Sequence, residues 1–259
     1  MQAFVINLDS ATDRWAFIEK NFAQSELRLE RVPAIDIKLL AFPHHDFSER
    51  SYRLLHGRTH NRREFACYLS HYKALQAFLA TSESHAVIGE DDIILRPDFD
   101  TVLEATLRYK QLWNIVRLSG LSAGHPFPIT RLHGAYSLCV NMGRLKGAGA
   151  YLIDRRAAET LVARLLPMRL PYDHAIDREW FWGLRAACIL PFPVSQTESD
   201  FLSSVQPGTH PRLSRTRRYL TTYPYQAVNE ISRWLFRAYY SVSLKAASWS
   251  RSDSGDSAP

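Results

Sequence analysis

Short apolar runs of strand length alternate with segments of helical periodicity along most of this chain, and no other feature constrains its fold as much. Residues 3–8 and 86–88 are apolar runs, whereas the apolar side chains of 64–80 recur at helical spacing on one side. Further strands are predicted at 115–118, 148–153 and 187–190. Strands that alternate with helices build a mainly parallel sheet covered on both faces. The sequence therefore predicts an α/β fold over residues 1–205.

The composition is that of a folded protein that needs no disulfides. Of the 259 residues, 46% are hydrophobic and 22% are charged, which is ordinary for a globular domain. Cys67, Cys139 and Cys188 are odd in number and lack CxxC spacing, which favours reduced thiols in the cytosol. The start of the chain lacks signal-peptide features, and no stretch approaches the ~20 apolar residues of a membrane span. A cytoplasmic protein is expected.

The sequence changes character beyond about residue 205. Four arginines precede a predicted helix at 225–245, namely Arg212, Arg215, Arg217 and Arg218. Five apolar residues of that helix share one face: Val228, Ile231, Leu235, Ala238 and Val242. A basic amphipathic helix suits peripheral contact with an anionic membrane, and packing onto the preceding domain is the alternative. We predict a basic linker and amphipathic helix at 206–246 and a disordered tail at 247–259.

Three adjacent carboxylates, Glu90, Asp91 and Asp92, directly follow the apolar run at 86–88. In open α/β sheets, ligands collect at the carboxyl ends of strands. Like charges at this spacing repel one another, and a bound divalent cation would relieve the repulsion. Residues two apart share a face of extended backbone, so Glu90 and Asp92 are placed to reach one ion. Carboxylate oxygens suit Mn²⁺ or Mg²⁺. A solvated acidic turn is the alternative.

A polar segment at 44–63 has no sustained period and is predicted to be a loop. The group His44-His45-Asp46, and His56 with His60, have spacings at which metal ligands occur. The arginines around them argue against a bound cation. A basic loop that meets phosphate or an anionic acceptor is one interpretation, and a solvated loop is the other.

Five motifs occur in a fixed order along residues 3–205. They are 4–9 with 12–14, the Ala-Cys-Tyr-Leu-Ser-His run at 66–71, the acidic stretch at 87–93, 149–153 with Ala157 and Ala158, and 171–174 with Asp177. In this order they resemble glycosyltransferase family 25, which includes bacterial lipooligosaccharide galactosyl- and glucosyltransferases and the collagen galactosyltransferases. Arg63 and Ala66 depart from that family, in which glycine is common at both positions.

The resemblance implies a GT-A-like single catalytic domain with a C-terminal helical extension. It also implies inverting transfer of galactose or glucose from a UDP-sugar to a saccharide or lipid-linked saccharide, in lipopolysaccharide, lipooligosaccharide or other surface glycan synthesis. The expected metal ligands are Glu90, Asp91 and Asp92, with His174 as a further candidate. The expected nucleotide-sugar contacts are Asn7, Asp9, Arg14, Ser70, His71, Glu90, Asp91, Gly149 and Tyr151. A surface pair with Asp13 is the alternative for Arg14.

Inversion needs one base that takes the proton of the acceptor hydroxyl. Asp173 is the first candidate and Asp177 the second, and residues four apart share a helix face. The alternative is structural, because Asp173 is a good N-cap for a helix predicted at 173–182 and Asp177 is spaced to pair with Arg178 or Arg185.

Two other classes of protein remain as rivals. The net charge of +6 and the pI of about 9.3 suit a nucleic-acid-binding module. Nothing in the chain resembles a nucleic-acid-binding fold signature, and the acidic triplet opposes phosphate without a metal, so we expect no nucleic acid partner. The second rival is an inactive relative that keeps the fold to bind a partner, and the intact triplet argues against it.

Overall fold

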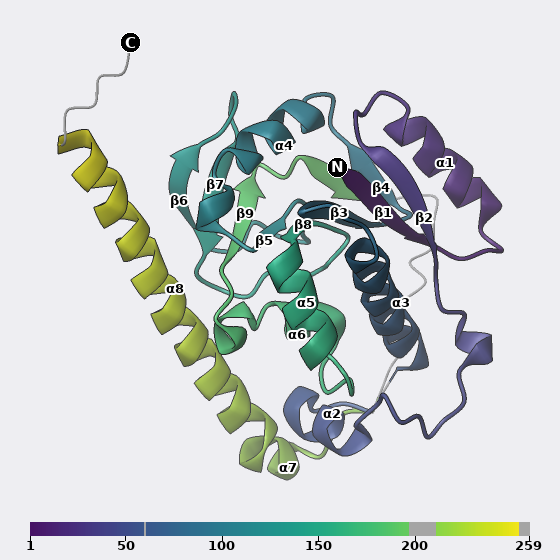
Figure 1. Cartoon of the computed structure of the whole chain (residues 1–259). Coiled ribbons are helices and arrows are strands. Elements are labelled where there is room, and N and C mark those ends of the chain that lie inside the picture. The colour runs from purple at the N-terminus through teal and green to yellow at the C-terminus, as the bar shows by residue number, and fades with distance from the viewer. Residues whose placement is uncertain (60, 197–210, 254–259) are drawn as a thin grey trace.

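A computed structural model describes residues 1–59, 61–196 and 211–253, and its centre is an eight-stranded sheet (Figure 1). The strand order is β2-β1-β3-β8-β5-β9-β7-β6. The strands are β1 (Gln2–Asn7), β2 (Arg28–Pro33), β3 (His85–Glu90), β5 (Ile115–Arg117), β6 (Pro126–Arg131), β7 (Ser137–Asn141), β8 (Ala150–Asp154) and β9 (Ala186–Leu190). A separate antiparallel pair joins β4 (Ile93–Leu95) to β10 (Val194–Gln196).

Six of the eight strands run in the same direction. β1 is parallel to β2 and to β3, and β5 is parallel to β9. β8 lies antiparallel between β3 and β5, whereas β7 is antiparallel to both β9 and β6. The sheet is therefore mixed but mainly parallel. With the helical extension at the C-terminus, this confirms the predicted GT-A-like α/β fold.

Helices cover both faces of the sheet (Figure 1). They are α1 (Thr12–Phe22), α2 (Glu49–His56), α3 (Arg62–Leu79), α4 (Phe99–Leu107), α5 (Arg155–Arg164), α6 (Tyr172–Ile176), α7 (Arg215–Leu220) and α8 (Thr222–Asp253), with 3-10 turns at Ile37–Leu39, Lys110–Leu112 and Glu179–Trp182. Along β1, Phe4 and Ile6 join the core under α3 and α5, whereas Ala3 and Val5 join the core under α1 and α4. Alternate residues thus face two separate apolar layers, as strands buried on both faces require.

Side-chain caps set the start of two helices that carry site residues. The Asn61 side chain accepts a hydrogen bond from the Arg63 N–H at the start of α3, which matches the helix predicted at 64–80. Asp154 accepts from the Ala157 N–H at the start of α5. Both caps satisfy N–H groups that the first helical turn leaves without a partner.

The segment at 44–63 is not a continuous loop, which corrects the prediction. It contains α2, of which only Tyr52 is buried and Gly57, at positive φ, ends the helix. A helix with one buried residue shows no repeat of apolar side chains at helical spacing, so this helix could not be predicted from the sequence pattern. His60 lies outside the described residues.

The helix predicted at 173–182 is also interrupted. α6 ends at Ile176, and a 3-10 turn follows at Glu179–Trp182. The break turns the side chains of Asp177 and Glu179 inward, where both are buried and paired with arginines of α8.

The C-terminal helix is longer than predicted. α8 continues to Asp253, into the predicted tail at 247–259, and residues 254–259 lie outside the described part of the chain. Of the predicted linker, residues 206–210 also lie outside the described residues, and α7 occupies its end. Among the described residues, no helix combines the length and the apolarity needed to cross a bilayer.

Candidate active site

The acidic triplet lies at the carboxyl end of β3, near the middle of the sheet. Glu90 is the last residue of the strand, and Asp91 and Asp92 form the turn into β4. β3 is paired with β1 on one side and β8 on the other, so Ile6 lies opposite Glu90 and the Glu90 N–H donates to the Gly149 carbonyl at 2.8 Å. The sheet register therefore brings the loops after β1 and before β8 beside the triplet.

Asp91 connects the triplet to the loop after β1. Its carboxylate accepts a hydrogen bond from Asn7 Nδ2 at 2.7 Å and lies 2.5 Å from Arg14 Nη2. Burial raises the pKa of Asp91, and the neighbouring charge of Arg14 works against that rise. Asn7 and Arg14 thus lie beside the triplet, and Arg14 pairs with Asp91 rather than with Asp13. Their role in binding the nucleotide-sugar stays a prediction.

Glu90 contacts the middle of α3. Its Oε1 lies 3.1 Å from His71 Nε2 and 3.8 Å from the Cys67 Sγ. Burial favours a higher pKa, but the hydrogen bond from His71 and the charges around it prevail and the pKa of Glu90 is lowered. Glu90 is therefore held as a carboxylate.

His71 belongs to a buried hydrogen-bonded chain that runs from Glu90 to α6. Its ring stacks on Tyr172 with centroids 4.1 Å apart, and its Nδ1 lies 3.4 Å from the Tyr151 hydroxyl. The hydroxyls of Tyr151 and Tyr172 are 2.6 Å apart. Because Tyr172 precedes Asp173, this chain fixes the position of the candidate base relative to the triplet.

Asp92 lies between Gln196 and Arg14 at the turn into β4. Its Oδ1 accepts from Gln196 Nε2 at 3.3 Å, and Arg14 Nη2 is 3.9 Å from Oδ2. Burial raises the pKa of Asp92 to about 6, and the nearby charge of Glu90 adds to the rise. A partly buried carboxyl whose ionisation is opposed by a neighbouring carboxylate fits a divalent cation, which offsets the repulsion.

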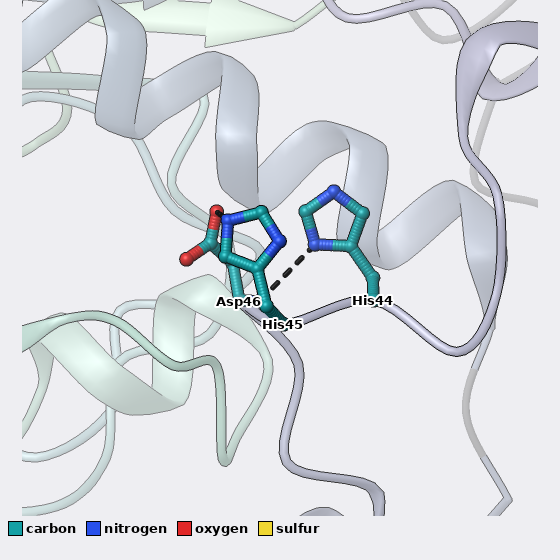
Figure 2. A group of neighbouring side chains, drawn as sticks. All are labelled: His44, His45 and Asp46. Atoms are coloured by element: carbon teal, nitrogen blue, oxygen red, sulfur yellow. Dashed lines mark hydrogen bonds and ion pairs between the residues drawn. The ribbon is translucent and has the colours of Figure 1, made fainter.

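Two groups of side chains in the described residues have metal-type ligand atoms within 4.8 Å of one another. One is Cys67, His71 and Glu90, which adjoins the triplet. The other is His44, His45 and Asp46, seen in Figure 2. There the two imidazole rings stack, His44 Nδ1 accepts from the Asp46 N–H, and His45 Nε2 is 3.2 Å from Asp46. The side chains of His44, His45 and Asp46 therefore have partners within the turn itself.

Asp173 lies in the first turn of α6, directly after Tyr172, whose ring stacks on His71. Its Oδ2 accepts from the Gly147 N–H at 3.2 Å and its Oδ1 from the His174 N–H at 2.9 Å. Burial raises the pKa of the Cys67 thiol, and the charges of Glu90 and Asp173 raise it further. Both charges therefore act on the same thiol.

Asp177 has a different environment from Asp173. It is buried, with Oδ1 3.0 Å from Arg237 Nη2 and Oδ2 3.1 Å from Arg233 Nε. These partners come from α8, not from the nearby arginines that the spacing suggested. Asp177 thus attaches α8 to the domain, which leaves Asp173 as the better placed of the two candidate bases.

His174 is not grouped with the triplet. Both nitrogens of its ring lie near Arg144 Nη1, at 3.3 and 3.2 Å, and its ring contacts His56 edge to face. A guanidinium beside both ring nitrogens opposes a bound cation there. The side chains of Asp9 and Ser70 also point elsewhere: Asp9 is 76% exposed beside Arg31, and the Ser70 hydroxyl donates to Ala66 and accepts from Ile35.

Sequence reasoning missed two polar residues at this site. Gln196 contacts Asp92 from β10, and its side chain lies so close to Gly149 that an added Cβ there would be 2.7 Å from Nε2. Arg31 donates from Nε to Asn7 Oδ1 at 2.9 Å. β10 has three residues and carries no motif, and the sequence of β2, with three charged residues among six, gave no signal that singled out Arg31.

Buried His56 makes the stability of this region sensitive to pH. Burial, with the charges of His174 and Arg58, lowers the pKa of His56 from 6.5 to about 3. The contribution of neutral His56 to the free energy of unfolding is complete above pH 6.5 and is lost as the pH falls toward 3. The reason is that the His56 imidazole is protonated in the unfolded chain at a higher pH than in the folded protein. We expect a loss of about 1.4 kcal/mol by about pH 5.5.

Urea unfolding of the wild type and of His56→Phe between about pH 7 and 5.5 measures this effect. The decline should be shallower in His56→Phe, with the remainder from His85 and His174, whose pKa values burial also lowers. The matched control is His45→Phe, since the His45 side chain is 85% exposed. Equal slopes for His56→Phe and the wild type would refute the assignment.

Comparisons with known proteins give one match that identifies a family. No curated protein matches the chain. Similar solved structures include A197 from STIV, with 10% identity, a TM-score of 0.40 and coverage of 79% of this chain and 87% of that one. They also include a glycosyltransferase involved in the glycosylation of the major capsid of PBCV-1, with 9% identity, a TM-score of 0.31 and 61% of each chain covered.

A third is mannose-1-phosphate geranyltransferase from Thermus thermophilus, with 12% identity, a TM-score of 0.28 and coverage of 74% of this chain and 60% of that one. At these scores, no functional conclusion follows from the three structures. The family model described as glycosyltransferase family 25 (LPS biosynthesis protein) matches residues 1–176, about two thirds of the chain. The chain therefore belongs to glycosyltransferase family 25.

Proposed function

We propose that this glycosyltransferase is a metal-dependent, inverting hexosyltransferase that uses a UDP-sugar. The proposed donor is UDP-galactose or UDP-glucose, and the proposed acceptor is a saccharide or lipid-linked saccharide of a surface glycan such as lipopolysaccharide. One observation supports it most: Glu90, at the end of β3, lies 3.1 Å from His71, and the His71 ring stacks on Tyr172, the residue before Asp173 on α6.

The triplet is the proposed donor end of the site. Asp92 and Glu90 would hold Mn²⁺ or Mg²⁺, and Asp91 would keep the loop after β1 in place through Asn7 and Arg14. When bound, the ion would act as a Lewis acid toward the departing diphosphate. The glycine at position 149 supports this arrangement. A Cβ there would collide with Gln196 and approach Ser119 to 3.1 Å.

Asp173 is the proposed base at the acceptor end. As the acceptor oxygen bonds to the anomeric carbon, the bond from that carbon to the diphosphate oxygen breaks and the acceptor proton passes to Asp173. The Gly147 N–H and the His174 N–H hold its two oxygens, one each. Each carboxylate oxygen has further acceptor capacity, so these bonds orient Asp173 without using it up.

A panel of UDP-, GDP- and CMP-sugars, incubated with and without Mn²⁺, tests the proposed reaction. We expect hydrolysis of a UDP-sugar that depends on Mn²⁺. Asp173→Asn should retain donor hydrolysis but lose transfer to a saccharide acceptor about 100-fold or more. Glu159→Gln is the matched control, because it neutralises an exposed carboxylate on α5.

Two results would count against the proposed activity. Undiminished transfer by Asp173→Asn would exclude that residue as the base. The absence of turnover with every donor, in a protein that is folded and takes up the metal, would instead favour the inactive relative. Separately, retention of the donor's anomeric configuration in the product would refute inversion.

A further inference from the structure

α8 turns arginines toward the protein and apolar side chains toward solvent. Arg233 and Arg237 have side-chain exposures of 1% and 3%, because both pair with buried acids. Six large side chains of the same helix are between 55% and 75% exposed: Val228, Ile231, Trp234, Leu235, Tyr239 and Val242. We call these six the α8 stripe. The polarity of this helix is therefore the reverse of that expected for a helix packed on a protein core.

The α8 stripe is continuous along the helix. Val228, Ile231, Leu235 and Val242 follow one another at spacings of three, four and seven residues, which places them on one face. From Val228 to Val242 this face is about 21 Å long. In Figure 1, α8 runs along one side of the domain. Single exposed apolar residues are common on proteins, but a contiguous row marks an interaction surface.

Positive charge adjoins the α8 stripe at its N-terminal end. Arg212, Arg215 and Arg217 are exposed there, beside the exposed side chains of Tyr219 and Leu220 on α7. Glu230 is the one acidic residue between 211 and 252, and it faces Arg144 and Arg233. No described acidic side chain of this segment therefore competes with an anionic surface at the α8 stripe.

We infer that the α8 stripe, with Arg215 and Arg217, docks onto an anionic lipid surface. Leu, Ile and Val side chains would enter the headgroup boundary, and Trp234 and Tyr239 are the residue types that prefer that boundary. The exposed arginines complement anionic headgroups, which a purely apolar partner would not require. This surface lies outside the proposed sugar-transfer site and does not depend on which donor is used.

The attachment of α8 gives this docking a consequence for the site. Asp177 and Glu179 hold Arg233 and Arg237, and Asp177 follows α6, which carries Asp173. Docking through α8 would therefore hold the acceptor end of the site at a fixed position relative to the membrane. A lipid-linked acceptor would gain from that position because it is confined to the same surface.

Co-sedimentation of the full chain with vesicles tests this inference. The vesicles are phosphatidylcholine alone and phosphatidylcholine with phosphatidylglycerol. We expect binding to the anionic vesicles, and a decrease of about ten-fold or more in Leu235→Glu. Leu39→Glu is the matched control, because Leu39 is also an exposed leucine, at 84%, and the charge change is the same. Arg215→Gln with Arg217→Gln should weaken anionic binding by about five-fold per arginine.

Each other outcome would overturn the inference. Equal binding of Leu235→Glu and Leu39→Glu would exclude the α8 stripe, and equal binding to both vesicles would exclude the anionic requirement. If the chain is a dimer that Leu235→Glu dissociates, and it does not bind vesicles, a second copy covers the stripe. Thermal unfolding checks that the variants fold, and donor hydrolysis without vesicles shows separately whether the proposed activity fails.

Discussion

Asp92→Ala is expected to lower metal-dependent donor hydrolysis by about 100-fold or more. Asp92 is the member of the triplet whose pKa rises to about 6, through burial and the charge of Glu90. Asp91 is held by Asn7 and Arg14, and Glu90 by His71. A cation therefore relieves more electrostatic repulsion at Asp92 than at its neighbours. Initial rates of UDP-sugar hydrolysis over a Mn²⁺ titration measure the effect.

Thermal unfolding separates a lost metal ligand from a damaged fold. Without metal, Asp92→Ala should unfold at or above the wild-type temperature, because one of two repelling carboxylates is removed. Mn²⁺ should raise the unfolding temperature of the wild type and of Glu159→Gln, but not of Asp92→Ala, since a ligand stabilises only the protein that binds it. Full Mn²⁺-dependent turnover by Asp92→Ala would contradict the central assignment.

The sequence predicted those site residues that lie at the end of a predicted strand or on an element next to it. The apolar run before Glu90 identified β3, and the position of a motif at the end of a strand predicts where its side chains lie. Asn7, Arg14, His71, Gly149 and Tyr151 lie beside or near the triplet for the same reason, because each follows, precedes or packs on a predicted element. These placements are observed, and their roles in binding the donor stay predictions.

The spacing of apolar residues does not predict contacts between residues that are far apart in the chain. The spacing of Val228, Ile231 and Leu235 predicted which residues share a face of α8, but not whether that face turns inward. Buried acids decide the orientation, since Glu179 and Asp177 draw Arg237 inward from about 60 residues away in the chain. Gln196 was missed for a related reason, because β10 pairs with β4 across about 100 residues.

Arg237→Met is expected to destabilise the protein by about 3–5 kcal/mol, the largest effect on stability that we predict. Arg237 donates to Glu179 from Nε at 2.7 Å and from Nη2 at 2.8 Å, and to Asp177 at 3.0 Å. Glu179 is completely buried, and burial raises its pKa against the opposing charge of Arg237. Methionine keeps much of the side-chain volume but leaves that buried carboxyl without its cation.

The pH dependence of the loss distinguishes an unpaired carboxyl from poor packing. In Arg237→Met the pKa of Glu179 should rise further, and a group with a raised folded-state pKa loses stability as the pH rises. Urea unfolding should therefore show a larger deficit near pH 8 than near pH 5. Adding Glu179→Gln should recover part of it, because the unpaired charge is then absent, whereas Arg215→Met, at an exposed arginine of α7, should have little effect. A deficit that is independent of pH would mean that packing, and not the buried ion pair, holds α8 to the domain.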